Sequence, residues 1–419
     1  MTSARRRAAA VAATASLVLL LPAQAGAAAP GGGSAPAAAD DLAVYTVPHT
    51  DSRIRTDINA SGAQVLGAKN DVATVEATGR QAEQLRARGL VLQRQATNAD
   101  VLAQRSGGGT RDFPPGDEAY HNYDEMVAEL DKAAADHPNL AVKSSIGKSF
   151  EQRDIPVLKI SDNPGQDENE PEVLFDCNQH AREHLTTEMC LRVVNRLTDN
   201  YNDPAVKNMV DNREIWVIPS VNVDGSAYDV ASGQYQGWRK NRQGPGTDVN
   251  RNWGYKWGCC GGASDDPQEE TYRGTGPFSA PESAAIARFI DSRVVDGRQQ
   301  IKSAIDFHTF SELVLWPFGH TPDDVTEGMT QQEYDRFSKV GHEIAGTNGY
   351  TPQQSSDLYT TDGDSLDWMW GKHKILAFTL EMYPSSGGLD GFYPPANVID
   401  RETARNDKAV DIVIREAGA

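Results

Sequence analysis

Two histidines and a glutamate lie where apolar runs of this sequence end. His180 and Glu183 are three residues apart and closely follow the run 173–175, and His308 closes the run 304–308. A catalytic zinc site needs three protein ligands and one open position for water, and these three residues can supply the ligands. Each part alone has a plainer explanation, namely a surface His–Glu pair and a core histidine. Together they predict a metal site.

A second group lies in the stretch 248–253. Asn250 and Arg251 place a carboxamide beside a planar guanidinium, a pair that could bind a free carboxylate in bidentate fashion. Asp248 could hold the outer nitrogen of a metal-bound imidazole. A solvated loop with a helix cap would use the same residue types. Arg239 follows Trp238 and could also reach a catalytic cleft.

A third group lies near the C-terminus. Glu381 ends an apolar run, and a carboxylate is costly to bury without a partner, so it should contact an ion, a cation or a site water. The preceding stretch 358–367 is polar and contains a glycine. This composition predicts a mobile loop, which carries Tyr359, Asp364 and Leu366.

The elements that must position these groups alternate along residues 112–419. We predict an α/β fold, with a mixed central sheet and helices on both faces. In such sheets, ligands bind beyond the strand ends, where the polar residues lie. Expected strands are 141–150, 155–161, 172–177, 215–221, 301–308 and 375–381, and expected helices are 120–135, 186–197, 280–290, 334–345 and 401–415.

The N-terminal region has a different character. Residues 1–27 combine three arginines, an apolar run and small-residue cleavage sites, which predicts a secretory signal, with a membrane anchor as the alternative. Residues 28–39 have the composition of a linker. Residues 40–105 show a small α/β pattern, with strands at 42–47, 71–75 and 90–92 and a helix at 80–87. Residues 106–111 are rich in glycine and end in Arg111, which predicts a hinge that proteases could cut.

The charge also changes along the chain. Residues 1–111 carry a net charge of +4 and residues 112–419 a net charge of −23, which gives −19 in total. An acidic body repels phosphates, so nucleic acid is not an expected partner. No segment after the signal is apolar for long enough to span a membrane. We therefore expect a secreted, extracellular protein that contacts no membrane once the signal is removed.

The chain has four cysteines: Cys177, Cys190, Cys259 and Cys260. Export would permit disulfides, and the spacing fits no structural zinc site. The adjacent Cys259 and Cys260 could form a vicinal bridge, remain thiols or pair elsewhere.

Taken in order, these motifs resemble the zinc carboxypeptidases of the funnelin type, the family of the pancreatic enzymes. The resemblance covers roughly residues 112–415. Residues 180–183 match the family's HxxE motif, and residues 248–252 match its carboxylate-binding stretch. Residues 112–114, 255–262 and 392–395 resemble a bacterial branch that includes carboxypeptidase T and secreted actinomycete relatives.

The resemblance implies a role for each candidate residue. His180, Glu183 and His308 would hold one Zn²⁺, and Glu381 would take a proton from water and pass it to the leaving amine. Arg239 would stabilise the oxyanion, and Asp248 would support a ligand histidine. The substrate's terminal carboxylate would be bound by Asn250, Arg251 and Tyr359, with Arg182 binding it during entry. The substrates would be peptide and protein C-termini.

Specificity is expected from Leu366, which matches the pocket floor of the family, and from Asp364, which lies two residues earlier. Leu366 would favour apolar terminal residues and Asp364 basic ones, although Asp364 beside Gly363 is also typical of a turn. Many relatives carry a tyrosine two residues after the last metal-binding histidine, where this chain has Phe310. We expect altered substrate contacts from the missing hydroxyl.

The resemblance also implies a zymogen. Residues 40–105 would be a pro-domain that covers the cleft until an activating protease cuts within 105–111, although a permanent binding module would show the same pattern. The acidic run 167–172 could bind structural Ca²⁺ or form a solvated turn. We expect a monomer. Two rival functions are a zinc amidase acting on cell-wall peptides and a non-catalytic peptide-binding module, which Glu381 argues against.

Overall fold

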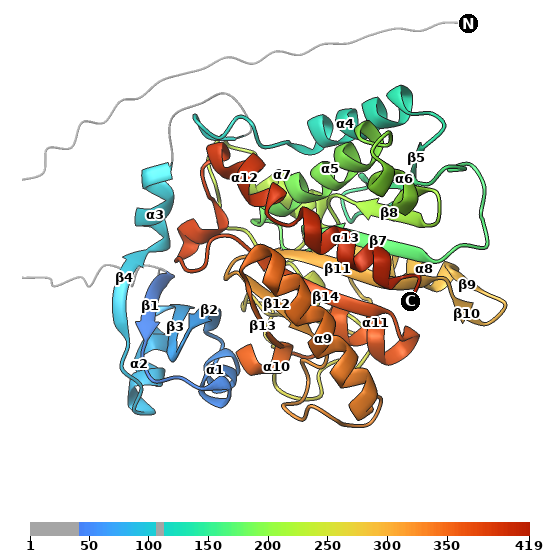
Figure 1. The fold of residues 1–419 in the computed structure, drawn as a ribbon. Coiled ribbons are helices and arrows are strands. Elements are labelled where there is room, and N and C mark those ends of the chain that lie inside the picture. Colours follow the sequence, from blue (N-terminus) through green and yellow to red (C-terminus); the bar gives the residue numbers. More distant parts are fainter. Residues whose placement is uncertain (1–41, 106–112) are drawn as a thin grey trace, which may run out of the picture. The chain divides into compact units, whose positions relative to one another are not determined.

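A mixed eight-stranded sheet runs through the C-terminal part of the chain (Figure 1). The computed structural model describes residues 42–105 and 113–419, and the strands lie in the order β13-β12-β14-β11-β7-β8-β6-β5. The inner neighbours β14, β11, β7 and β8 are parallel, whereas β12, β6 and β5 add antiparallel pairs. The strands are β5 (Ala141–Lys148), β6 (Asp154–Ile160), β7 (Glu172–Cys177), β8 (Glu214–Ile218), β11 (Ile301–Thr309), β12 (Leu313–Trp316), β13 (Thr351–Gln354) and β14 (Leu376–Met382).

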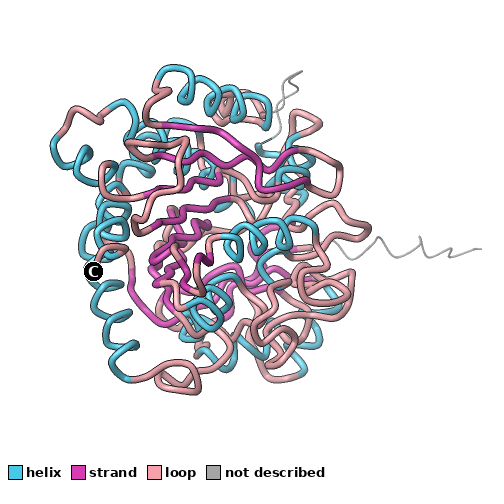
Figure 2. The backbone as a smooth tube through the Cα atoms, turned by 90° about the vertical axis from the view of Figure 1, so that its right-hand side faces the viewer, coloured by secondary structure: helices cyan, strands magenta, loops and turns pink. Residues whose placement is uncertain are grey.

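Helices cover both faces of this sheet, as the alternation of side chains along β7 shows. Val173 and Phe175 belong to one core cluster and Leu174 to the other, because successive strand residues point to opposite faces. Figure 2 shows the strands between the two sets of helices. The first cluster includes α4 (Tyr123–Asp136), α5 (His184–Asp199), α9 (Gln331–Asn348) and α13 (Asp407–Glu416), and the second includes α8 (Pro281–Ser292) and α11 (Ser365–His373).

Short elements connect these layers. The α-helices are α6 (Pro204–Val210), α7 (Val223–Val230), α10 (Ser355–Leu358) and α12 (Ile399–Ala404). The 3-10 helices are η1 (Val249–Arg251), η2 (Leu389–Phe392) and η3 (Ala396–Val398), and β9 (Val294–Val295) pairs with β10 (Arg298–Gln299).

Local sequence fixes the ends of the long helix α9. Thr330 and Glu333 form a capping box, in which each side chain accepts a hydrogen bond from the other residue's backbone N–H. Gly349 ends the helix with φ of 73°, a left-handed conformation that glycine adopts without a steric penalty. The helix therefore begins and ends where its own residues allow it, and its buried face packs against the sheet.

Residues 42–105 form a second, smaller sheet with its own apolar core. The four strands are antiparallel in the order β2-β3-β1-β4, and the buried core is made by residues such as Val47, Ile58 and Leu85. The elements are β1 (Ala43–Val47), α1 (Ser52–Asn59), β2 (Gln64–Lys69), β3 (Val72–Ala77), α2 (Gly79–Ala87), β4 (Gln93–Thr97) and α3 (Asn98–Arg105).

The structure confirms the predicted fold class and corrects two predicted elements. The strand expected at 90–92 is wrong: β4 follows it at Gln93–Thr97 and pairs with β1, while Leu92 only contributes its side chain to the core. The helix expected at 401–415 is broken at Asn406. This buried side chain donates to the Glu402 carbonyl and to the Tyr350 hydroxyl, so the chain turns around it.

Two disulfides answer the question left open by the sequence. Cys177 at the end of β7 pairs with Cys190 in α5, and the adjacent Cys259 and Cys260 pair with each other. The expected signal (1–27), linker (28–39) and hinge (106–111) lie outside the described residues. Every helix within the described ranges is too short or too polar to cross a bilayer.

Candidate active site

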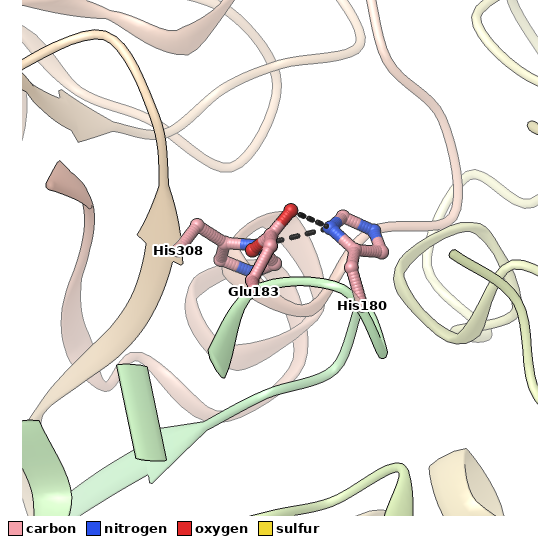
Figure 3. A group of neighbouring side chains, drawn as sticks. All are labelled: His180, Glu183 and His308. Carbon is pink, nitrogen blue, oxygen red and sulfur yellow. Dashed lines mark hydrogen bonds and ion pairs between the residues drawn. The ribbon is translucent and has the colours of Figure 1, made fainter. Parts of the chain in front are cut away.

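His180, Glu183 and His308 converge at the carboxyl ends of β7 and β11 (Figure 3). His180 Nδ1 lies 2.9 Å from Glu183 Oε1, and His308 Nδ1 lies 2.9 Å from Glu183 Oε2. The two Nδ1 atoms are 3.1 Å apart, and all three side chains are buried. The three residues that the sequence singled out, which lie up to 128 positions apart in the chain, therefore meet at one point.

This arrangement fits a divalent cation. Two atoms that each lie about 2 Å from a tetrahedral zinc ion are separated by ~3.3 Å, close to the three distances above. Two facing ring nitrogens also share their lone pairs most readily through a cation. The set of two imidazoles and one carboxylate is a catalytic zinc set, for which the fourth position stays open.

Two buried aspartates hold the outer nitrogens of the histidines. His180 Nε2 lies 3.1 Å from Asp248 Oδ1, and His308 Nε2 lies 3.1 Å from Asp306 Oδ2. Each carboxylate therefore favours the tautomer whose Nδ1 lone pair faces the shared point. Burial alone would raise the pKa of Asp248, but Arg239 and His180 outweigh it and hold this pKa well below its usual value.

Glu381 lies beside this group on the neighbouring strand. In the parallel pair β11 and β14, His308 and Glu381 are register partners, so both side chains point to the same face. Burial raises the pKa of Glu381 to about 8, with His308 opposing the rise and Glu183 adding to it. The carboxyl is thus a group that can gain and lose a proton near neutral pH.

Arg239 shares Asp248 with His180. Its Nε and Nη2 donate to Asp248 Oδ2 at 3.1 and 2.8 Å, and the residue is buried. Because His180 contacts the other oxygen, the guanidinium and the imidazole are held by one carboxylate. A positive charge is therefore fixed beside the metal-ligand group.

Asn250 and Arg251 lie in η1, which approaches His308. Asn250 Nδ2 is 3.3 Å from His308 Nε2, and Asn250 Oδ1 accepts a hydrogen bond from Ser365 N at 2.8 Å. Arg251 Nη1 donates to the Asn250 carbonyl and Nε to the Gly262 carbonyl. Both of these contacts are to backbone carbonyls, so they hold the guanidinium in place without neutralising its charge.

One cavity collects most of the predicted residues. It is lined by the three metal-ligand candidates and by Arg239, Asn250, Arg251, Tyr359, Asp364, Leu366 and Glu381. Burial raises the pKa of the Tyr359 hydroxyl, although nearby Arg251 opposes this. The cavity therefore combines a metal-ligand set, a carboxyl group, fixed cations and an apolar wall.

Comparison with known proteins agrees with this geometry. The sequence pattern of the zinc carboxypeptidase family matches residues 126–409. The chain is 48% identical over 384 residues to a zinc carboxypeptidase of Saccharothrix mutabilis subsp. capreolus, with 88% of each chain covered. The chain belongs to the zinc carboxypeptidase family. It is thus a metallocarboxypeptidase, an enzyme that acts on peptide C-termini.

More distant relatives extend the comparison. The enzyme is 33% identical over 291 residues to carboxypeptidase A1 of Rattus norvegicus, covering 67% of this chain and 66% of the relative. The crystal structure of the carboxypeptidase A from Helicoverpa armigera has the same fold, with a TM-score of 0.73 and 23% identity. That match covers 90% of this chain and 98% of the other. Residues 113–419 make up less than 90% of the chain, so the match must also include residues that precede them.

Asp364 takes part in local structure as well as lining the cavity of the carboxypeptidase. Its Oδ1 accepts a hydrogen bond from Asp367 N at 2.7 Å and caps α11, and its Oδ2 accepts one from the Thr361 hydroxyl. Burial, reinforced by the nearby Asp367 carboxylate, raises the pKa of Asp364 to about 7. Leu366, in the first turn of α11, is 4% exposed and belongs to a core cluster. Phe310 is buried against Phe392, with ring centroids 4.9 Å apart.

Arg182 and Asp248 are not in the cavity lining. Arg182 is 1% exposed, stacks over Phe392 at 4.0 Å and donates to the Gly237 carbonyl. It also contacts the N-terminal domain, donating to Gln64 Oε1 at 3.2 Å and lying 3.7 Å from Glu76 Oε2. The guanidinium of Arg182, which was expected to bind the substrate carboxylate, is thus already bound by residues of the N-terminal domain.

The acidic run 167–172 contributes to a second cluster. Ligand atoms of Asp167, Glu172 and Glu214 lie within 4.8 Å of one another. However, Arg293 pairs with Asp167 and Glu172, and Lys159 pairs with Glu214 at 2.6 Å. Protein cations already neutralise much of this cluster.

Several residues that were not predicted from the sequence support the site from behind. Asp306 Oδ2 accepts hydrogen bonds from Gln179 Nε2 and Ser365 Oγ, both at 2.6 Å. Ser365 thereby links the support of His308 to that of Asn250. The only sequence signal was a polar residue, Asp306, inside an apolar strand, which required a buried partner.

Proposed function

We propose that this enzyme releases single residues from peptide C-termini, with His180, Glu183 and His308 holding one Zn²⁺. The observation that carries this proposal is the shared cavity, in which the metal-ligand set, Glu381 and the Asn250–Arg251 pair face one another. When bound, Zn²⁺ polarises a carbonyl group and makes a coordinated water more acidic. Asp248 and Asp306 keep the two imidazoles turned toward the shared point.

Glu381 is the proposed general base and acid. Glu381 is the register partner of His308, and its carboxyl would lie next to the attacking water and take a proton from it as the new C–O bond forms. The same carboxyl then delivers that proton to the nitrogen of the leaving amine as the C–N bond breaks. Arg239, fixed by Asp248, stabilises the negative charge that develops on the scissile carbonyl oxygen.

Asn250, Arg251 and Tyr359 are proposed to bind the terminal carboxylate. A buried guanidinium favours a carboxylate partner strongly, and an internal peptide bond offers no such charge. This requirement would restrict the enzyme to chain ends. Tyr359 follows α10 on a loop and would close over the bound residue.

Specificity for both hydrophobic and basic residues is proposed from Leu366 and Asp364. Leu366 offers an apolar contact in the cavity wall. Both oxygens of Asp364 already accept a hydrogen bond, one from the first turn of α11 and one from Thr361. A basic side chain would have to share one of these oxygens. We therefore expect a preference for hydrophobic termini, with basic termini accepted less well at low pH.

We also propose that the enzyme is secreted as a zymogen, with residues 40–105 as its pro-domain. Gln64, Val65 and Leu66 line the same cavity as the metal-ligand set, and Arg182 is held by Gln64 and Glu76. An activating protease would cut within residues 105–111. Arg182 would then become free to bind the carboxylate of an arriving substrate, and the mature enzyme would act as a monomer.

Structural calcium at residues 167–172 is a separate proposal. Asp167, Glu172 and Glu214 supply oxygen ligands, and Arg293 would have to turn away to admit the ion. EGTA added at fixed zinc should lower the thermal midpoint by several degrees if calcium is bound. An unchanged midpoint would refute the proposal.

The decisive experiment is hydrolysis of matched peptides after limited proteolysis of the full-length, zinc-loaded chain. Peptides with a free C-terminus should lose one residue at a time, and the same peptides with a C-terminal amide should not be cleaved. Chelation should abolish the activity, and added zinc should restore it. Cleavage of amidated peptides, or of cell-wall peptides alone, would point instead to an amidase.

A further inference from the structure

A loop with an exposed disulfide lies against the part of the site that is proposed to bind the substrate carboxylate. This vicinal loop, residues 255–262, carries the Cys259–Cys260 bridge at its exposed tip. The other disulfide, Cys177–Cys190, is fully buried. The two bridges therefore differ in their access to solvent and to reagents.

The vicinal loop holds the segment that follows Tyr359. The backbone N–H groups of Cys260 and Gly262 both donate to Asp362 Oδ2 at 3.0 Å. Asp362 is fully buried and lies between Tyr359 and Asp364 in sequence. A Cβ on Gly262 would lie 2.5 Å from the Thr360 carbonyl oxygen, so the loop packs directly on this backbone.

The vicinal loop also holds Arg251. The Gly262 carbonyl accepts a hydrogen bond from Arg251 Nε at 3.2 Å, and the Arg251 side chain is 4% exposed. Gly262 thus contacts Arg251 through its carbonyl and Asp362 through its N–H. The guanidinium and the Tyr359 segment are both positioned from a residue that lies two positions after the bridge.

The path of this loop needs a constraint. The φ angles of Lys256, Gly258 and Gly261 are 52°, 64° and 78°, in the left-handed region. A lysine adopts this conformation only with a steric penalty. A bond between adjacent side chains removes freedom from the backbone that joins them, and so favours one path of the loop.

We propose that the Cys259–Cys260 bridge is a positioning element for the terminal carboxylate, acting through the Gly262 carbonyl and Arg251. The inference rests on the proposed role of Arg251. With the bridge intact, Gly262 stays where Arg251 Nε and the Asp362 carboxylate both reach it. With the bridge open, the loop gains conformational freedom and Arg251 binds carboxylates less well. The three metal-ligand candidates are held by one another and by Asp248 and Asp306, all outside this loop, so they should keep their arrangement.

The bridge can be opened selectively with a phosphine reductant. The phosphine attacks one exposed sulfur and the S–S bond breaks, releasing the other sulfur as a thiolate. Water then hydrolyses the thiophosphonium group, which leaves a phosphine oxide and two cysteine thiols. Since Cys177–Cys190 is buried, it should stay oxidised under the same conditions.

The test compares the oxidised and reduced forms of the full-length, zinc-loaded chain after limited proteolysis. Mass spectrometry after alkylation should show labels on Cys259 and Cys260 alone. Reduction should raise KM for a peptide with a free C-terminus by about fivefold or more, with kcat within about twofold. Inhibition by an N-acyl amino acid should weaken by the same factor, whereas inhibition by its amide should not change. Reoxidation should restore both constants.

A double variant, Cys259→Ser with Cys260→Ser, should show the high KM without reductant and no further response to it. If this variant does not fold, the reduced native protein still decides the question. A KM that changes less than about twofold on complete reduction would overturn the inference, as would equal weakening of the acid and the amide. Oxidised protein that cleaves no free C-terminus would instead refute the proposed function.

Discussion

At the residue scale, Glu381 is the group on which the proposed chemistry most depends. The substitution Glu381→Gln keeps the shape of the side chain and removes the carboxyl group that can accept and donate a proton. We expect kcat to fall by about 10²–10⁴-fold while zinc content and KM change little, because general acid and base catalysis is lost and binding is not. Steady-state kinetics and metal analysis of the processed protein measure both effects.

A matched control for this variant is Glu343→Gln. Glu343 lies on α9, is exposed and pairs with Arg415 at the surface. Its replacement should leave kcat unchanged and cost less than about 1 kcal/mol of stability. Activity of Glu381→Gln within tenfold of the parent enzyme would contradict the assigned role.

The pH dependence of stability should reveal the state of Asp364. Its pKa of about 7 in the folded protein lies above the usual value for aspartate, so the folded state binds more protons than the unfolded state between about pH 4 and pH 7. Stability from this group is therefore present at low pH and lost as the pH rises through 7. Asp364→Asn removes the titration and can keep the cap on α11. The variant should gain at least about 1 kcal/mol relative to the parent between pH 4.5 and pH 8.

Chemical unfolding at both pH values measures this gain. Asp203→Asn is the control. Asp203 is an exposed N-cap of α6, and its substitution also replaces a carboxylate by an amide. That variant should differ from the parent by a constant amount. A pH-independent difference for Asp364→Asn would show that the carboxyl is ionised throughout the range.

At the element scale, the packing of α9 on the sheet can be tested with two glycines of the same helix. Gly341 faces Trp316 of β12, and a Cβ there would lie 2.7 Å from the indole ring. The Cβ of Gly346 would meet open space. Alanine gains about 1 kcal/mol over glycine in a helix, but a clash in a packed core costs about 1–3 kcal/mol.

We therefore expect Gly346→Ala to stabilise the enzyme by up to about 1 kcal/mol. The Gly341→Ala variant should be less stable than the Gly346→Ala variant by about 1–3 kcal/mol. Denaturant titration of the two variants under identical conditions measures the difference directly. If Gly341→Ala proves at least as stable as Gly346→Ala, then α9 can move away from β12 without cost.

The sequence could predict the site because its residues lie at the ends of strands. His308 and Glu381 each close an apolar run, and parallel strands bring their carboxyl ends to one edge of the sheet. The residues behind them were not predictable in the same way. Ser365 contacts Asp306 from 59 positions away, and Asp362 contacts the vicinal loop from about 100 away. Such pairings depend on the folded path of both segments, which no local pattern records.

Elements themselves were predicted best where burial and periodicity agree. The strand 172–177 is buried throughout and was predicted with its observed bounds. The edge strand β4 is polar and held by backbone pairing with β1, so its sequence offered no apolar signal. Asn406 broke the expected last helix because its buried amide bonds to Asn348 and Tyr350, on segments distant in sequence.

At the scale of the whole molecule, Arg55 of the N-terminal domain tests the proposed zymogen. Arg55 is buried and donates to the backbone carbonyls of Leu358 and Asp357 at 2.5 and 2.8 Å, directly before Tyr359. Thr56 of the same helix accepts a hydrogen bond from Thr360 N. Arg55→Leu should remove the hydrogen bonds that Arg55 makes to this loop and raise the activity of the uncut chain by about tenfold. That change corresponds to ~1.4 kcal/mol of binding free energy between the N-terminal domain and the cleft.

Arg53→Leu provides the control, because Arg53 lies on α1 but points to solvent. It should leave the activity of the uncut chain unchanged. After proteolysis, both variants should match the parent enzyme, since the N-terminal domain no longer contacts the cleft. Equal activity of all three uncut chains would mean that Arg55 does not restrain the cleft.

The carboxylate of Asp248 has a wider consequence for how this enzyme could be altered. One of its oxygens faces the His180 ring and the other faces the Arg239 guanidinium. A substitution made there to favour a different transition metal would also displace the cation that is proposed to face the reacting carbonyl. Selectivity for the ion and turnover are thus tied to a single side chain, and a redesign that separates them must first give Arg239 another anchor.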